Sequence, residues 1–443
     1  MKKLLRSLFI ALIPIAAVSC AQDDMTPAIS QPDTPAAETQ PGLLRSAAEA
    51  IQQAITDRSN MLGIPTPGSR AELDVKCIKR PAPSRSGEND TLLYVVNFPD
   101  EEGYAVIPAD RRIETLAVTE AGSFSSIDEM QNPAAKEFMK AATAYATNTF
   151  IRDTTTFKPP TRPSFEILKS DTIAEYNYPA KIKTRWGQAG AIAKYATNNA
   201  PLYPHRVVGC VPLACAMALS YLEMPKGIQL TFPNSPVKAT SLNWNSIKGH
   251  ARWMVPSLES LDCVCGASAE AHEQLARLCR ELGHLCHASY EVIDGLPATG
   301  SNITNALKAL QTILPTKNFV QRNGIKSIRA DVKDGILIMF GQGSDGHCWI
   351  CDGWYYLKYE ENAYSNDGLY DGVGRPVLTF LRTVSTVEHD YVHINWGWDG
   401  ADNGYYRPHL LNTIKIIQPD NKSDGHVSSP HYYNEISYIR VPA

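Results

Sequence analysis

A cysteine placed at the start of an apolar helical run constrains this chain more than any other feature. Cys210 follows Gly209, and the residues after Pro212 are good helix formers, so the sequence predicts a helix with this cysteine in its first turn. The positive end of a helix dipole stabilises a thiolate and lowers the pKa of the thiol. Cysteines before helices are otherwise more often buried and inert, and Cys215 in the same helix is interpreted as a packing residue.

A histidine far downstream is the natural companion of this cysteine. His347 ends a glycine-rich turn that leads into an apolar, strand-like run. The pattern predicts an imidazole exposed at the end of a strand, since Gly343 and Gly346 allow close approach of the backbone. A nearby imidazole is the second factor that turns a thiol into a nucleophile. Cys210 and His347 are therefore the candidate nucleophile and general base.

Two further segments carry side chains that could complete an acyl-transfer site. Gln188, upstream of the cysteine, can donate its amide N–H to an oxyanion together with the backbone N–H of Cys210. Asn395 can accept the imidazole N–H and fix the ring, while the indole of Trp396 covers that bond from water. Taken alone, Gln188 could be a solvated polar side chain, and Trp396 and Trp398 could be core residues or a sugar-binding platform.

The N-terminus is typical of a lipoprotein signal peptide over residues 1–19. Basic residues precede an apolar stretch that is too short to span a membrane, and Ala17-Val18-Ser19 leads directly to Cys20. Cys20 would then be acylated and would anchor the chain to the cell envelope, at the outer membrane or the cell surface, without a membrane-crossing segment. The alternatives are an ordinary secretory signal cut near Ala21, and release from the membrane after maturation.

Composition divides the rest of the chain into four parts. Residues 20–43 are a polar, proline-rich tether that cannot bury a core, and residues 44–152 are predicted to form a small α+β domain. The elements predicted in this domain are, in order, a helix over 44–61, strands over 91–98 and 104–107, and a helix over 134–150. Residues 153–177 are a linker in which proteolytic cleavage is expected. Residues 178–443 contain every catalytic candidate.

Charge and cysteine usage argue against other classes of function. Lys and Arg (42) nearly balance Asp and Glu (46), and no basic block is present, so nucleic-acid binding is not expected. Cys263, Cys265, Cys279 and Cys286 suggest a zinc site, but their spacing differs from that of zinc modules, and the last two fall in a predicted helix. Buried or disulfide-bonded cysteines are the favoured interpretation, and no metal or other cofactor is expected.

These motifs together resemble the streptopain family of papain-fold cysteine peptidases. The motifs are Gly209-Cys210-Val211, Gly346-His347, Asp352-Gly353, the run from His393 to Gly400, and Gly404-Tyr405-Tyr406, with Trp186-Gly187-Gln188 similar to the family's oxyanion segment. A cysteine followed by a histidine about 130–150 residues later is the chain order of papain-like enzymes. In the preceding domain, residues 94–110 and 120–124 resemble the family's inhibitory pro-domain.

The resemblance implies an α+β fold, in which a papain-like domain with a helical subdomain and an antiparallel-sheet subdomain follows a small α+β pro-domain. With the signal peptide, it implies a secreted, lipid-anchored endopeptidase that is made as a zymogen, acts on protein or peptide substrates and is inhibited by its own pro-domain. Cys210 would be the nucleophile, His347 the general base and acid, and Gln188 an oxyanion donor. Asn395 and Trp396 would orient and shield His347. The substrate-binding residues would be Ser301, Trp398 and Gly346.

The chain departs from the family pattern near the catalytic candidates, and three other functions stay open. Cys348 stands where alanine is typical, and Pro212-Leu213-Ala214-Cys215 replaces a small-residue pattern. Neither departure removes a catalytic group. An inactive, peptidase-derived surface binding protein, an amidase or transglutaminase-like enzyme, and a chain that retains its pro-domain as a permanent regulator would share these residues.

Overall fold

The computed structural model describes residues 44–64, 73–80, 91–153, 166–196, 207–248, 268–293, 296–342, 346–370, 376–411 and 435–443. The predicted signal peptide (1–19), the lipidation site Cys20, the tether (20–43), Cys263 and Cys265 lie outside these ranges. Within them, the helices are all too short or too polar to cross a bilayer.

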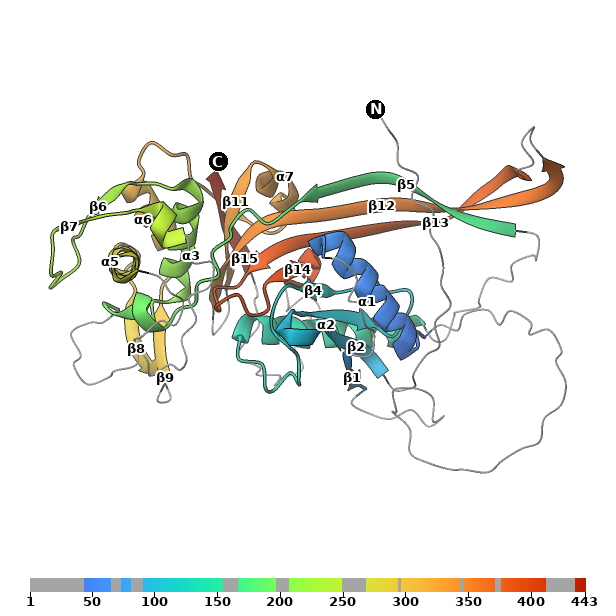
Figure 1. Cartoon of the computed structure of the whole chain (residues 1–443), viewed down its shortest axis with the longest axis horizontal. Coiled ribbons are helices and arrows are strands. Elements are labelled where there is room, and N and C mark those ends of the chain that lie inside the picture. Colours follow the sequence, from blue (N-terminus) through green and yellow to red (C-terminus); the bar gives the residue numbers. More distant parts are fainter. Residues whose placement is uncertain are drawn as a thin grey trace, which may run out of the picture.

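One antiparallel sheet, with 11 strands in the described ranges, runs through the molecule (Figure 1). Strands β1–β4 come from the N-terminal part and the others from the chain after residue 165. β4 pairs with β14, so the two parts form one continuous sheet. The strands are, in order across the sheet, β1 (Asp74–Lys79), β2 (Thr91–Asn97), β3 (Tyr104–Pro108), β4 (Ala117–Thr119), β14 (Gly404–Tyr406), β13 (Pro376–Asn395), β12 (His347–Tyr370), β11 (Gly335–Gln342), β15 (Glu435–Pro442) and β10 (Val320–Asn323), with β5 (Glu166–Tyr178) paired to β12.

Some of the helices lie at one end of the molecule, others lie beside the N-terminal strands, and one lies against the central strands (Figure 1). The described helices are α1 (Ala47–Leu62), α2 (Pro133–Asp153), α3 (Cys210–Leu222), α4 (Trp244–Lys248), α5 (Ala269–Leu285), α6 (Ile303–Ile313) and α7 (Ile328–Lys333). Helices α3, α5 and α6 share a core at one end of the molecule, beside the short strand pairs β6 (Gly227–Gln229) with β7 (Ala239–Ser241) and β8 (Ser289–Ile293) with β9 (Leu296–Gly300). Helices α1 and α2 pack on the N-terminal strands. The predicted α+β class, with helical and antiparallel-sheet subdomains, is confirmed.

Local sequence signals explain why the predicted helices form where they do. Ser46 and Glu49 make a capping box at the start of α1, and Gly63 ends that helix with φ 67°. The side chain of Ser268 caps the first turn of α5, whose apolar residues recur at helical spacing on its buried face. The helices and strands predicted for residues 44–152 correspond to α1, β2, β3 and α2.

The predicted linker, residues 153–177, ends in a strand rather than in irregular chain. Residues 154–165 lie outside the described ranges, whereas β5 begins at Glu166 and pairs with β12 as far as Tyr178 opposite Trp354. Most of the polar side chains of β5 are exposed, as on the edge of a sheet. This composition resembles that of a linker, which explains the difference.

The N-terminal part and the rest of the chain share hydrophobic cores. Phe138 of α2 packs edge-on against Tyr406 of β14, with ring centroids 4.8 Å apart. In a second shared cluster, Tyr391 of β13 is fully buried and donates its hydroxyl proton to the backbone oxygen of Thr115 (2.8 Å). Each buried aromatic side chain of this kind contributes about 1.5–3 kcal/mol through apolar burial. Removal of residues 44–153 would therefore expose a broad apolar face.

Candidate active site

Cys210 is the first residue of α3, as the sequence predicts. Gly209 before it has φ 92°, and a Cβ atom there would lie 2.6 Å from Cγ2 of Thr299, so the position requires glycine. Thr299 of β9 donates its hydroxyl proton to the backbone oxygen of Val207 (2.9 Å). The β8–β9 hairpin therefore packs directly against the residues that lead into the candidate nucleophile.

The Cys210 thiol is neutral at pH 7 in this structure. Burial raises its pKa above the usual range, against the opposing effect of hydrogen bonds from the backbone N–H groups of Cys348 and Val211. The helix N-terminus predicts a lowered thiol pKa, whereas in this state burial raises the pKa because it removes hydration from the thiolate.

His347 is the first residue of β12 and is buried. Its ring stacks on Trp349, with centroids 6.1 Å apart, and its Nε2–H donates to the backbone oxygen of Trp396 (3.0 Å). Burial lowers the pKa of the imidazole to about 4, although the bond to Trp396 acts in the opposite direction. At neutral pH the ring is therefore uncharged, with its proton on Nε2 and the lone pair of Nδ1 available as a base.

The thiol and the imidazole face opposite sides of β12. Side chains alternate along a strand, so His347 and Trp349 point to one face and Cys348 and Ile350 to the other. Trp349 lies in the core shared with the N-terminal part, whereas Cys348 and Ile350 lie in the core around α3. The structure gives no hydrogen bond or ion pair between Cys210 and His347, both of which it describes. The two groups are therefore not paired in this state.

Asn395, directly before Trp396 in the chain, does not hold the ring of His347 through its side chain. Its amide N–H donates to the backbone oxygen of Thr184 (2.8 Å), and its side-chain oxygen accepts from the backbone N–H of Gly397 (3.1 Å). The sequence predicts that Asn395 accepts the imidazole N–H, but in this structure the carbonyl of Trp396 does so instead. The physical reason is that the Asn395 side chain is already occupied in joining the chain before Trp186 to the turn after β13.

Gln188 lies in the segment that Asn395 anchors. Its backbone oxygen accepts from the backbone N–H of Val208 (2.8 Å), which ties it to the chain just before Cys210. Gly187 packs against the Asp399 carboxylate so closely that no Cβ would fit. Among the described residues, none makes a hydrogen bond with the half-buried side-chain amide of Gln188, so this donor is available to a ligand.

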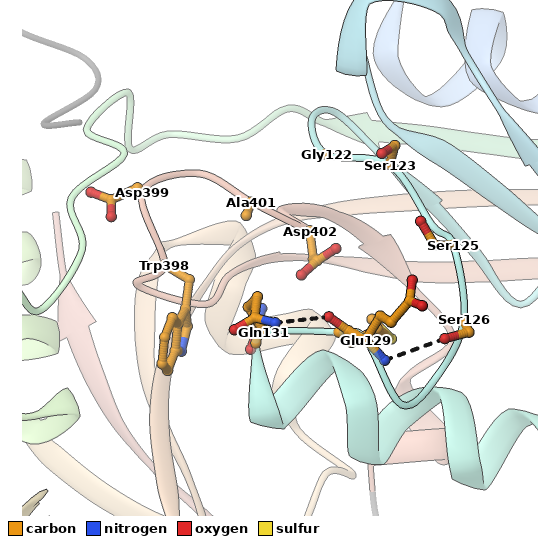
Figure 2. A pocket seen from close by; sticks show the side chains of 12 residues that line it. Gly122, Ser123, Ser125, Ser126, Glu129, Gln131, Trp398, Asp399, Ala401 and Asp402 are labelled. Carbon is orange, nitrogen blue, oxygen red and sulfur yellow. Dashed lines mark hydrogen bonds between the residues drawn. The ribbon is translucent and has the colours of Figure 1, made fainter. Parts of the chain in front are cut away.

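The residues predicted to bind substrate lie at three separate positions. Ser301 follows β9 and donates its hydroxyl proton to the backbone oxygen of Cys286 (2.6 Å). Gly346 is exposed directly before His347. Trp398 lines a cavity of about 320 Å³ between its own turn and residues 122–132 of the N-terminal part (Figure 2). The structure thus brings Gly346 to the catalytic candidates and places Trp398 against the N-terminal part.

A buried network of charged side chains lies beside these residues. The sequence alone does not predict these contacts. Nδ1 of His393 lies 2.6 Å from Asp352 and Nε2 lies 3.1 Å from Glu120, while Glu120 also pairs with Arg185 (3.1 Å). Asp352 accepts two further hydrogen bonds, from the backbone N–H groups of Lys181 (2.9 Å) and the next residue (2.7 Å).

His393 is charged within this network. Burial disfavours the imidazolium, but the charge of Asp352 and the bonds to Asp352 and Glu120 outweigh it and raise the pKa to about 10. Asp352 and His393 both belong to the motifs quoted above, but their pairing required the register of β12 with β13, in which Gly353 lies opposite His393.

Comparison with known proteins locates the site within a known sequence family. Residues 186–406 match the model described as the Peptidase C10 family, and this span includes Gln188, Cys210, His347, Asn395 and Trp396. A structure of a Prevotella intermedia prointerpain A fragment is 21% identical, covers 83% of this chain and 98% of its own, and has a TM-score of 0.48. A structure of the active interpain A cysteine protease of the same organism is 19% identical, with 65% and 99% covered and a TM-score of 0.38. No curated protein sequence matches.

Proposed function

The chain belongs, through residues 186–406, to the peptidase C10 or streptopain family of cysteine peptidases, and from this premise we propose that it is an endopeptidase made as a zymogen. The observation that carries the proposal is that the four segments with the predicted catalytic residues are joined by contacts around α3. Gln188 is tied to Val208, the Cys210 sulfur faces the residue after His347, and Asn395 bonds the chain before Trp186.

In the proposed reaction, the Cys210 thiolate attacks the carbonyl carbon of a peptide bond after its proton passes to Nδ1 of His347. The amide of Gln188 and the backbone N–H of Cys210 stabilise the oxyanion, a contribution of about 3–4 kcal/mol per donor. The imidazolium then protonates the leaving amine, and the thioester forms. Water hydrolyses this thioester with His347 as the base, which restores the thiol.

The neutral, unpaired thiol and imidazole support a latent state. For the reaction to start, the ring of His347 must leave the Trp349 side of β12 and turn towards Cys210. The Nε2–H bond to Trp396 already selects the tautomer in which Nδ1 can accept the thiol proton. In that position, Trp396 and Asn395 would orient and shield the ring from the turn after β13.

Residues 44–153 are proposed to be the inhibitory pro-domain. Their docking by strand pairing and shared cores supports this role, since they pack against the turn that holds His347. Cleavage is proposed within residues 154–165, because β5 is paired along its length with β12 and would stay with the peptidase. Anchoring to the cell envelope through acylated Cys20, with protein or peptide substrates outside the cytoplasm, rests on the sequence signals described above.

The experiment that tests this proposal compares the wild-type chain with Cys210→Ala after limited proteolysis has removed the pro-domain. Casein hydrolysis should fall by on the order of a thousandfold or more in Cys210→Ala. Cys215→Ala, a variant in the same helix, should retain activity and serves as the control. Full activity in Cys210→Ala would refute the assignment of the nucleophile.

A second candidate function is an inactive surface binding protein, which the unpaired thiol and imidazole would also suit. It is favoured if Cys210 fails to react with an epoxide inhibitor after the pro-domain has been removed.

A further inference from the structure

The Glu120 carboxylate is held between two cationic side chains of the peptidase region. One of its oxygens lies 3.1 Å from Nε2 of His393 and the other 3.1 Å from a terminal nitrogen of Arg185. The side chain of His393 is 3% exposed and that of Glu120 is 21% exposed, so the contact is largely sheltered from water. Glu120 belongs to the N-terminal part, and both of its partners belong to the part that remains if residues 44–153 are removed.

The cationic side of this contact is built into the peptidase region. Asp352 is fully buried and holds Nδ1–H of His393 at 2.6 Å, which directs Nε2–H towards the position of Glu120. If Glu120 left, Asp352 would balance one of the two cations, and one positive charge would remain. Nε2–H would then be a charged donor without its protein acceptor. The vacated position would therefore favour an anion.

The backbone before Glu120 forms the short strand β4, and main-chain hydrogen bonds to the neighbouring segment continue past it to Ala121. β4 pairs with β14 directly before it, and the Glu120 N–H donates to the backbone oxygen of Asn403 (2.7 Å). The Asp402 N–H donates to the backbone oxygen of Ala121 (3.2 Å). Gly404 permits this approach, because a Cβ atom there would collide with the backbone of Val118. A ligand that replaces this segment can thus form main-chain hydrogen bonds as well as the carboxylate contact.

We propose that Arg185 and His393, together with the edge of β14, form a binding site for an extended polypeptide segment that carries a carboxylate side chain. Glu120 occupies the site in the latent chain, and an acidic segment of a substrate or protein inhibitor occupies it after the pro-domain leaves. The inference rests on the proposed release of the pro-domain. The site lies outside the catalytic residues, but Arg185 directly precedes Trp186, and His393 lies two residues before Asn395. Occupancy is therefore linked to both segments that flank the catalytic cysteine and histidine.

The test uses the full chain after processing, with Cys210 alkylated by iodoacetamide so that peptides are not cut. A fluorescent peptide with the sequence of residues 115–124 and its Glu120→Gln counterpart are titrated, and binding is followed by anisotropy. The acidic peptide should bind about ten times more tightly than the neutral peptide, since charge-assisted bonds are roughly twice as strong as neutral ones.

Variants of the protein identify the partner of the carboxylate. Arg185→Gln should lower the affinity for the acidic peptide to about that for the neutral peptide. The affinity for the neutral peptide should not change. Lys183→Gln removes an exposed charge two residues away and should change neither of the two affinities. Equal binding of the two peptides, or no binding of either, would overturn the site. An inactive processed chain that still prefers the acidic peptide would refute the proposed peptidase activity and leave this site standing.

Discussion

The sulfur of Cys210 accepts a hydrogen bond from the backbone N–H of Cys348, the residue directly after His347. The thiol thus already lies against the strand that carries the imidazole, while the imidazole itself occupies the other face of that strand. In the proposed activation, the imidazole would move to the face of β12 against which the thiol lies.

Removal of the N-terminal domain should make Cys210 react with iodoacetamide at neutral pH. In the intact chain, burial raises the thiol pKa above 9.0, so the thiolate forms and labelling accelerates only in the alkaline range. Once His347 pairs with the thiol, the pKa of the Cys210 thiol should fall to about 7 or below. Peptide mapping by mass spectrometry across this range would measure both profiles. Cys279, whose burial raises its pKa to about 12, is the internal control and should stay unlabelled.

Asp352→Asn should destabilise the chain by about 3–5 kcal/mol, because it leaves the charged His393 buried without its main partner. Urea unfolding followed by tryptophan fluorescence measures this loss. Asp334→Asn is the matched control, since Asp334 is 63% exposed and should change stability by no more than about 0.5 kcal/mol. A comparable effect of the two substitutions would contradict the importance of the buried pair.

The free energy of unfolding should decrease as the pH rises through about 10. His393 has a usual pKa of 6.5 and a folded pKa of about 10, so the folded state binds its proton more tightly than the unfolded state. The resulting stabilisation is complete below pH 6.5 and is lost as the pH rises through 10. Urea midpoints across this window should fall in the wild type and change less in Asp352→Asn. Parallel pH profiles would argue against a charged His393.

Glu120→Gln in the full chain should weaken the docking of the N-terminal domain by about 1.5–3 kcal/mol, since it replaces hydrogen bonds to charged partners with neutral ones. Hydrogen exchange of residues 117–122 should become faster, and limited proteolysis should produce active enzyme sooner. Asp74→Asn, in the same domain, removes an ion pair with Lys76 in which both side chains are exposed (57% and 44%), and it should have little effect. Unchanged exchange in Glu120→Gln would show that strand pairing alone holds the domain.

N-terminal sequencing of the active form should find a terminus between residues 154 and 166. A cut after Glu166 would remove part of β5 from its pairing with β12 and is not expected. Deletion of residues 156–163 should slow activation, whereas an active form that begins well inside β5 would contradict the assignment of the cleavage segment.

Sequence reasoning located those features that depend on neighbours along the chain. The first helix of the N-terminal domain, the helix that begins at Cys210 and the strand that begins at His347 all follow from short patterns. The strand β5 was missed because an edge strand carries the polar composition of a linker.

The rest of the site depends on contacts between distant residues. The acceptor for His347 is a backbone carbonyl, which any residue at position 396 would supply, so no side-chain type could reveal it. Glu120 and His393 lie 273 residues apart in the sequence, and their contact exists because β4 is paired with β14. Both residues fall in segments that resemble the family, but without the sheet order nothing in the sequence indicates that they contact each other.

The sheet that joins the N-terminal domain to the peptidase region has a consequence for the irreversibility of activation. While the chain is intact, the connection between the two parts keeps them at an effective concentration on the order of millimolar, so even modest contacts are occupied almost all the time. One cut before β5 turns the same contacts into a bimolecular equilibrium that depends on bulk concentration. If the chain acts outside the cytoplasm as proposed, dilution would then separate the two parts without any change in the contacts themselves, and the separated domain would rarely return.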